Sequence, residues 1–174
     1  MYATRVTRRV RAPAEAVYRA LTDPDDLAVW RVPENTTAHV HTFEAREGGA
    51  FRISLVHAAP GAVGKSGGRA DTYHGHFVTL VPRVRVVEVF AFETDDEALR
   101  GTMTLTTTLT EADGATDVEV LHEGIPDAIS RADNELGTRM ALDHLARLIE
   151  ERNPTGGPHT KEGDGGTGGD GLRS

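Results

Sequence analysis

The sequence contains no cysteine, few aromatic residues (5%) and no long apolar run, and its formal charge is -8. Without cysteine the chain has no disulfides and no thiolate metal ligands, so nothing indicates an oxidising compartment. The acidic balance argues against a nucleic-acid-binding surface, which needs clustered Lys and Arg. No apolar stretch is long enough to suggest a membrane span. Because the basic segment 1–13 lacks the apolar core of a secretory signal, we expect a cytoplasmic protein.

The length of 174 residues suits one globular domain, but the composition changes abruptly after Arg152. Residues 153–174 are rich in glycine, and Leu172 is the only large apolar residue among them. Such a segment cannot bury enough apolar area to offset the entropy of ordering it. We therefore predict a folded domain over residues 1–152 and a disordered tail over residues 153–174.

Period-two alternation of apolar and polar residues dominates the predicted domain and is typical of half-buried strands. Short turn sequences separate the runs, for example Pro82-Arg83 and Asp113-Gly114. This spacing predicts an antiparallel meander of seven strands, at about 2–11, 37–46, 50–57, 72–81, 84–93, 102–110 and 116–123.

Three helices are predicted around these strands. Pro13 opens a short helix, and Asp23-Pro24 opens a second that runs to Trp30. Ser130 resembles the cap of a helix of about twenty residues. Its apolar residues, from Leu136 to Ile149, cover an arc wide enough to need a large partner surface. The sheet is the only such surface. We therefore expect an α+β fold in which a curved seven-stranded antiparallel sheet wraps around a long C-terminal helix, with two short helices after the first strand.

Five ordered stretches resemble a known family: RAPAEAVYRALTDP (11–24, running on to Trp30), REGGAFR (46–52), GHF (75–77, running on to Pro82 and Val86-Val87), HEGIP (122–126) and LDHLARL (142–148). Together they resemble the helix-grip, START-like (SRPBCC) superfamily, specifically bacterial proteins similar to the activator of the heat-shock protein 90 ATPase. The resemblance implies the helix-grip fold and a cavity between the sheet and the C-terminal helix. It leaves function open, because the superfamily includes lipid carriers, polyketide cyclases and co-chaperones.

The chain departs from the family pattern at two points. A Trp-Trp pair is common in the family where this chain has Trp30-Arg31, and Gly-Trp is common where it has Gly137-Thr138. A threonine in place of indole either enlarges the cavity or lies on its rim without consequence.

Polar residues on apolar faces are the candidates for the cavity. Glu88 shares its side of a strand with Val86 and Phe90. A desolvated carboxylate there could act as an acid, a base or a ligand anchor; alternatively, a bulge exposes it to solvent or a nearby Arg pairs with it. His122 lies on a strand, and His144 lies in an i, i+4 ladder with Leu136, Met140 and Leu148. Each either points into the cavity or is a hydrogen-bonded core or rim histidine.

We predict a ligand-binding site formed by Trp30, Phe51, Phe77, Glu88, Phe90, Met103, His122, Met140 and His144. No catalytic motif is recognisable, and we expect no cofactor. The pairs His39/His41 and His74/His76 could each offer two metal ligands, but they lack a third at fixed spacing, so we interpret them as solvated strand faces. Gly64-Lys65-Ser66 resembles the end of a P-loop, but Ala59 replaces the first glycine and a strand follows, so we expect a glycine-rich loop instead.

These observations favour a domain that binds a small apolar or amphipathic molecule without catalysis. Two alternatives remain. The first is a co-chaperone-like module with a chaperone as its partner. The second is a cyclase- or hydrolase-type enzyme that uses the same cavity. We expect no nucleic-acid partner, and the chain is either a monomer or a homodimer.

Overall fold

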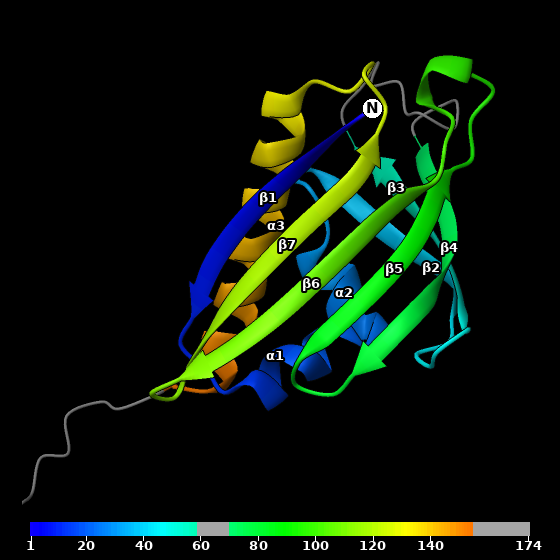
Figure 1. The fold of residues 1–174 in the computed structure, drawn as a ribbon. Helices are drawn as coiled ribbons and strands as arrows, with labels where there is room; N and C mark the ends of the chain where they lie inside the picture. The colour runs from blue at the N-terminus through cyan, green and yellow to red at the C-terminus, as the bar shows by residue number, and fades with distance from the viewer. Residues whose placement is uncertain (59–69, 155–174) are drawn as a thin grey trace, which may run out of the picture.

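Seven antiparallel strands form one sheet, and α1, α2 and α3 lie on one of its faces (Figure 1). The computed structural model describes residues 1–58 and 70–154, so Gly64-Lys65-Ser66 and the predicted tail from residue 155 onward lie outside the described residues. The elements are β1 (Tyr2–Val10), α1 (Ala14–Leu21), α2 (Pro24–Trp30), β2 (Thr36–Phe43), β3 (Ala50–His57), β4 (Ala70–Val81), β5 (Arg85–Phe92), η1 (Glu97–Leu99), β6 (Met103–Ala112), β7 (Ala115–Ile125) and α3 (Arg131–Arg152). The predicted α+β helix-grip architecture is confirmed.

The order of the strands is β1-β7-β6-β5-β4-β3-β2, so the sheet is open and has β1 and β2 at its edges. From β2 to β7 each strand pairs with its neighbour in sequence, as in a meander, but β1 pairs with β7 and not with β2, so the predicted meander of seven strands is wrong for the first strand. Arg83 has a φ of 66° and Asp113 a φ of 55°, as tight hairpin turns require. Register shifts between Val40 and Thr42, and between Phe77 and Thr79, interrupt the pairing; such bulges bend a sheet.

The caps that start α2 and α3 are formed by the residues that the sequence indicates. The Asp23 carboxylate accepts hydrogen bonds from the backbone N–H groups of Asp25 (2.9 Å) and Asp26 (3.0 Å). The Ser130 hydroxyl accepts one from the N–H of Asp133 at 3.3 Å. Each bond satisfies a backbone donor that has no partner within its helix.

Only the C-terminal half of α3 packs tightly. Its buried residues are Leu142, Leu145, Ala146 and Ile149, whereas Leu136 in the N-terminal half is 54% exposed. The expectation that Leu136 belongs to the buried arc is therefore wrong. Because the N-terminal half makes no such tight packing, space remains between it and the sheet.

Gly75 allows β4 and β5 to approach closely. A Cβ atom at this position would lie 1.9 Å from the Val89 carbonyl oxygen and 2.7 Å from the Phe90 Cα. Both are backbone atoms, so the two strands would have to move apart. We expect Gly75→Ala to lower the free energy of unfolding by about 2 to 3 kcal/mol, the upper part of the range for overpacked cores.

Urea unfolding of Gly75→Ala and of a matched variant, Gly137→Ala, measures this effect. A Cβ atom at Gly137 meets no atom within 4 Å. Alanine there gains about 1 kcal/mol of helix propensity, so Gly137→Ala should stabilise the protein. Equal changes in the two variants would contradict a close approach at Gly75.

Candidate ligand-binding pocket

A pocket of about 350 Å³ lies in the space between the sheet and the N-terminal half of α3. β3 and β5 contribute Phe51, Leu55, Phe90 and Phe92 to its wall. Gly137, Thr138 and Met140 face it from α3. A mostly apolar concavity of this size, with a few polar groups, is typical of small-molecule sites. Thr138 thus lines the pocket, where an indole side chain would occupy part of the volume.

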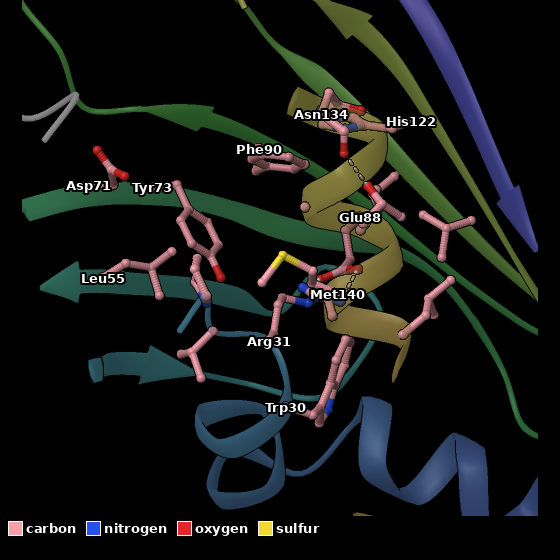
Figure 2. Close-up of a pocket in the computed structure, with 18 of the residues that line it drawn as sticks. Trp30, Arg31, Leu55, Asp71, Tyr73, Glu88, Phe90, His122, Asn134 and Met140 are labelled. Carbon is pink, nitrogen blue, oxygen red and sulfur yellow. Dashed lines mark hydrogen bonds and ion pairs between the residues drawn. The ribbon is translucent and has the colours of Figure 1, made fainter. Parts of the chain in front are cut away.

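An ion pair between Arg31 and Glu88 lies in the wall of the pocket (Figure 2). The two guanidinium nitrogens donate to the two carboxylate oxygens at 2.8 and 3.1 Å. Only 2% of the Glu88 side chain and 17% of the Arg31 side chain are exposed. Burial lowers the pKa of the Arg31 guanidinium, but the Glu88 carboxylate more than compensates, so this pKa is raised overall. Of the alternatives for Glu88, pairing with a nearby Arg is the observed one.

Trp30 and the end of α2 fix the position of Arg31. The Trp30 indole N–H donates to the carbonyl oxygen of Ala20 at 2.9 Å, and the ring is buried. The Arg31 guanidinium carbon lies 4.8 Å from the centre of the Trp30 ring, within range of a cation–π interaction. The residue that replaces the second Trp of the family pattern therefore provides the counter-ion of Glu88.

His122 on β7 lines the same pocket and is 9% exposed. Its Nδ1 atom lies 3.1 Å from the Asn134 side-chain nitrogen. Its Nε2 atom is buried and has no hydrogen-bond partner among the described residues. Burial, followed by the Arg31 charge, lowers the pKa of the imidazole to about 4, while the Asn134 hydrogen bond opposes the shift. His122 is therefore neutral at pH 7.

Tyr73 on β4 is a further polar residue of the pocket, and it is not among the residues predicted from the sequence. Its side chain points toward Arg31 and Met140 (Figure 2). The hydroxyl is buried beside the Arg31 guanidinium. Burial raises the pKa of this phenol, and the charge of Arg31 and a side-chain hydrogen bond with it oppose the shift. The available signal was alternation, because Tyr73 shares a strand face with Gly75 and Phe77.

Aromatic rings form a continuous surface along the pocket. The ring centres of Phe51 and Tyr73 are 6.2 Å apart, and those of Tyr73 and Phe90 are 5.7 Å apart. The Phe90 and His122 rings follow at 5.6 Å, with their planes inclined by 31°. These spacings are those of interacting aromatic pairs.

The structure brings six of the nine predicted site residues together in this pocket: Trp30, Phe51, Glu88, Phe90, His122 and Met140. Phe77 and Met103 are fully buried in the core and are not among the residues that line it. His144 is half-buried on α3 and does not line it either. An i, i+4 ladder turns about 40° around the helix at each step, so Leu136, Met140 and His144 do not share one direction.

The histidine pairs lie away from the pocket. The His39 and His41 rings are in contact, with centres 4.5 Å apart, and His41 Nε2 lies 2.8 Å from the Ser54 hydroxyl. His57 Nε2 lies 2.9 Å from the Asp71 carboxylate. Within residues 1–58 and 70–154, no group of three or more His, Asp or Glu side chains is arranged to hold a metal ion. No helix in these ranges has the length and apolar character to cross a membrane.

Residues 11–150 match the family described as "Activator of Hsp90 ATPase homolog 1-like protein". The sequence search of curated proteins found no match.

Solved structures with this fold come from several bacteria. A crystal structure from Chromobacterium violaceum is 36% identical with a TM-score of 0.76, covering 85% of this chain and 96% of that one. One from Rhodobacter sphaeroides is 21% identical with a TM-score of 0.71, covering 87% and 93%. A solution structure from Arthrobacter aurescens is 17% identical with a TM-score of 0.70, covering 86% of each.

Proposed function

The chain belongs to the Activator of Hsp90 ATPase homolog 1-like family, and we propose that it binds one small apolar or amphipathic molecule in the pocket between its sheet and α3. The observation that carries this proposal is the pocket itself. It combines a largely apolar lining with the buried Nε2 atom of His122, which has no hydrogen-bond partner among the described residues. Buried polar atoms in proteins usually have a hydrogen-bond partner, and a bound ligand would provide the partner that is missing here.

The polar groups of the pocket support binding rather than acid–base catalysis. Both oxygens of Glu88 are held by Arg31, so this carboxylate is not free to exchange protons with a substrate. His122 is neutral and is oriented by Asn134. A general base must lie within hydrogen-bond reach of the proton that it abstracts. Both Glu88 oxygens already accept hydrogen bonds from Arg31, so neither is available for this role.

The fluorescence of diphenylhexatriene, an apolar dye that is dark in water, tests the proposal. We expect saturable binding of one dye per chain. Thr138→Trp should weaken it at least about tenfold, because the indole fills pocket volume that the dye needs. Arg147→Trp is the matched control, since Arg147 lies on the exposed side of the same helix. Equal dye affinities in the two variants would show that the dye does not bind in this pocket.

A second measurement separates this proposal from the co-chaperone alternative. The same two variants can be added to an ATPase assay of a bacterial Hsp90. An effect on the ATPase that survives Thr138→Trp would show an interaction through an outer surface rather than through the pocket.

A further inference from the structure

His122 has one ring nitrogen that the protein itself does not satisfy. The residue lines the pocket and is 9% exposed, and its Nε2 atom has no hydrogen-bond partner among the described residues. The other ring nitrogen, Nδ1, lies 3.1 Å from the Asn134 side-chain nitrogen. A buried polar atom without a hydrogen bond is a substantial cost to the folded state, so a ligand atom that pairs with Nε2 removes this cost.

The contacts of Asn134 determine whether Nε2 donates or accepts. The Thr4 hydroxyl donates to the Asn134 side-chain oxygen at 2.7 Å, so the amide nitrogen is the atom that faces His122, and it donates to Nδ1. Burial, followed by the Arg31 charge, lowers the pKa of the imidazole to about 4, so the ring is neutral at pH 7. A neutral imidazole that accepts at Nδ1 carries its hydrogen at Nε2. The unpartnered atom is therefore a donor, and its partner is an acceptor.

The surroundings of the His122 ring are apolar. Its centre lies 5.6 Å from the centre of the Phe90 ring, with the two planes inclined by 31° (Figure 2). Leu105 on β6 is opposite His122 in the strand register and also lines the pocket. A ligand that reaches the donor therefore packs an apolar body against Phe90 and Leu105, and carries its acceptor at one end.

The charges of the pocket favour a neutral acceptor over a carboxylate. Among the described residues that line the pocket, Arg31 is the only Arg or Lys, and it already donates to both oxygens of Glu88. A ligand carboxylate at His122 would be buried against a neutral donor, without a cation of its own among these residues. Burying a charge in this way costs more free energy than one hydrogen bond returns.

We propose that His122 Nε2 donates a hydrogen bond to a neutral acceptor oxygen of the ligand, such as a carbonyl, and that this contact sets the preference of the pocket among apolar molecules of similar shape. The inference rests on the proposed function and adds to it a ligand class and the residue that recognises it. Tyr73 takes no part, because its hydroxyl lies beside Arg31 and the Phe90 ring lies between the Tyr73 and His122 rings.

Competition against diphenylhexatriene measures this preference with three compounds that share one ring system. Fluorenone carries an acceptor oxygen, fluorene carries no polar group, and carbazole carries an N–H donor. Because water solvates the three compounds differently, each affinity is divided by that of fluorene, both in the natural sequence and in His122→Phe. We expect the relative affinity of fluorenone to fall about three- to tenfold in the variant, as the loss of one neutral hydrogen bond predicts. The relative affinity of carbazole should not fall.

Two controls accompany this comparison. His144→Phe is the matched variant, because His144 is half-buried on α3 and is not among the residues that line the pocket. It should leave both relative affinities unchanged. Fluorene carboxylate tests the charge of the ligand, and it should bind the natural sequence at least about tenfold more weakly than fluorenone does.

A spectroscopic measurement on the natural sequence keeps the proposal testable if His122→Phe does not fold. Long-range ¹H–¹⁵N NMR spectra of the ¹⁵N-labelled protein distinguish a ring nitrogen that carries hydrogen from one that does not. We expect the His122 hydrogen at Nε2. Its resonance should move downfield when fluorenone is added, because the hydrogen bond deshields it, and should not do so with fluorene.

The outcomes are distinguishable. An unchanged relative affinity of fluorenone in His122→Phe, a fall in that of carbazole, or a hydrogen at Nδ1 overturns the assignment of His122 as the donor, while the pocket remains a binding site. Equal affinities of fluorenone and fluorene carboxylate overturn the preference for a neutral ligand. Failure of diphenylhexatriene to bind overturns the proposed function, and the ligand class with it. A loss confined to fluorenone, with the hydrogen at Nε2, supports both.

Discussion

Arg31→Met should cost about 3 to 5 kcal/mol of folding free energy at pH 7. The substitution removes the guanidinium that pairs with both Glu88 oxygens. The carboxylate stays in a site where only 2% of its side chain is exposed. Removing one partner of a buried ion pair is strongly destabilising, because the remaining charge stays buried without its counter-ion. For a domain with a total stability of about 5 to 15 kcal/mol, this is a large fraction.

Urea unfolding of four proteins measures the contribution of the pair: the natural sequence, Arg31→Met, Glu88→Leu and the double variant. Glu88→Leu should cost less than Arg31→Met, because the guanidinium keeps 17% of its surface in solvent and retains its contact with Trp30. The double variant should recover most of the loss, since an apolar pair of similar volume often replaces a buried ion pair at little cost.

The double variant provides the sharpest comparison. If its loss equals the sum of the two single losses, the two side chains act independently, and the geometry of 2.8 and 3.1 Å has no energetic consequence. If Arg31→Met alone costs less than about 1 kcal/mol, the Glu88 carboxylate reaches solvent in the variant, and its burial does not constrain the pocket.

The fold could be predicted from the sequence because its signals are local and repeated. Alternation along each strand, the turn residues Pro82-Arg83 and Asp113-Gly114, and the cap at Ser130 all indicate the same architecture. The five family stretches add the order of the elements.

The pocket was less predictable because its polar contacts join elements far apart in the sequence. Arg31 is 57 residues from Glu88, and its place in the Trp-Trp position of the family pattern does not reveal which carboxylate it pairs with. Alternation correctly placed Glu88 on the inner face, but its partner depends on how the end of α2 packs against the sheet. Tyr73 was missed for a different reason. A tyrosine on an apolar strand face is ordinary, and only its position in the pocket wall beside Arg31 makes it informative.

The i, i+4 ladder of α3 shows a further limit. It correctly predicts Met140 in the pocket, but Leu136 is exposed and His144 lies elsewhere. The buried residues Leu142, Leu145 and Ile149 follow the i, i+3, i+7 pattern instead. A helix that packs along half of its length has no single buried face that its whole sequence could reveal.

The pocket should also make folding stability depend on pH through His122. The pKa of this imidazole is lowered from 6.5 to about 4 in the folded protein, by burial first and then by the Arg31 charge. Between these values the unfolded chain binds more protons at His122 than the folded protein does. Stability from this residue is therefore complete above about pH 6.5 and is lost as the pH falls toward about 4, by up to about 3 kcal/mol.

His122→Phe separates this effect from the titration of the carboxylates. Phenylalanine keeps a ring beside Phe90 but does not titrate, so the difference in unfolding free energy between the natural sequence and the variant isolates the histidine. We expect this difference to shift against the natural sequence by up to about 3 kcal/mol between pH 7 and pH 4. His76→Gln controls for the loss of a histidine as such, because its side chain is exposed. A difference that stays constant with pH would mean that His122 is solvated in the folded protein, in which case its Nε2 atom is not buried in the pocket wall.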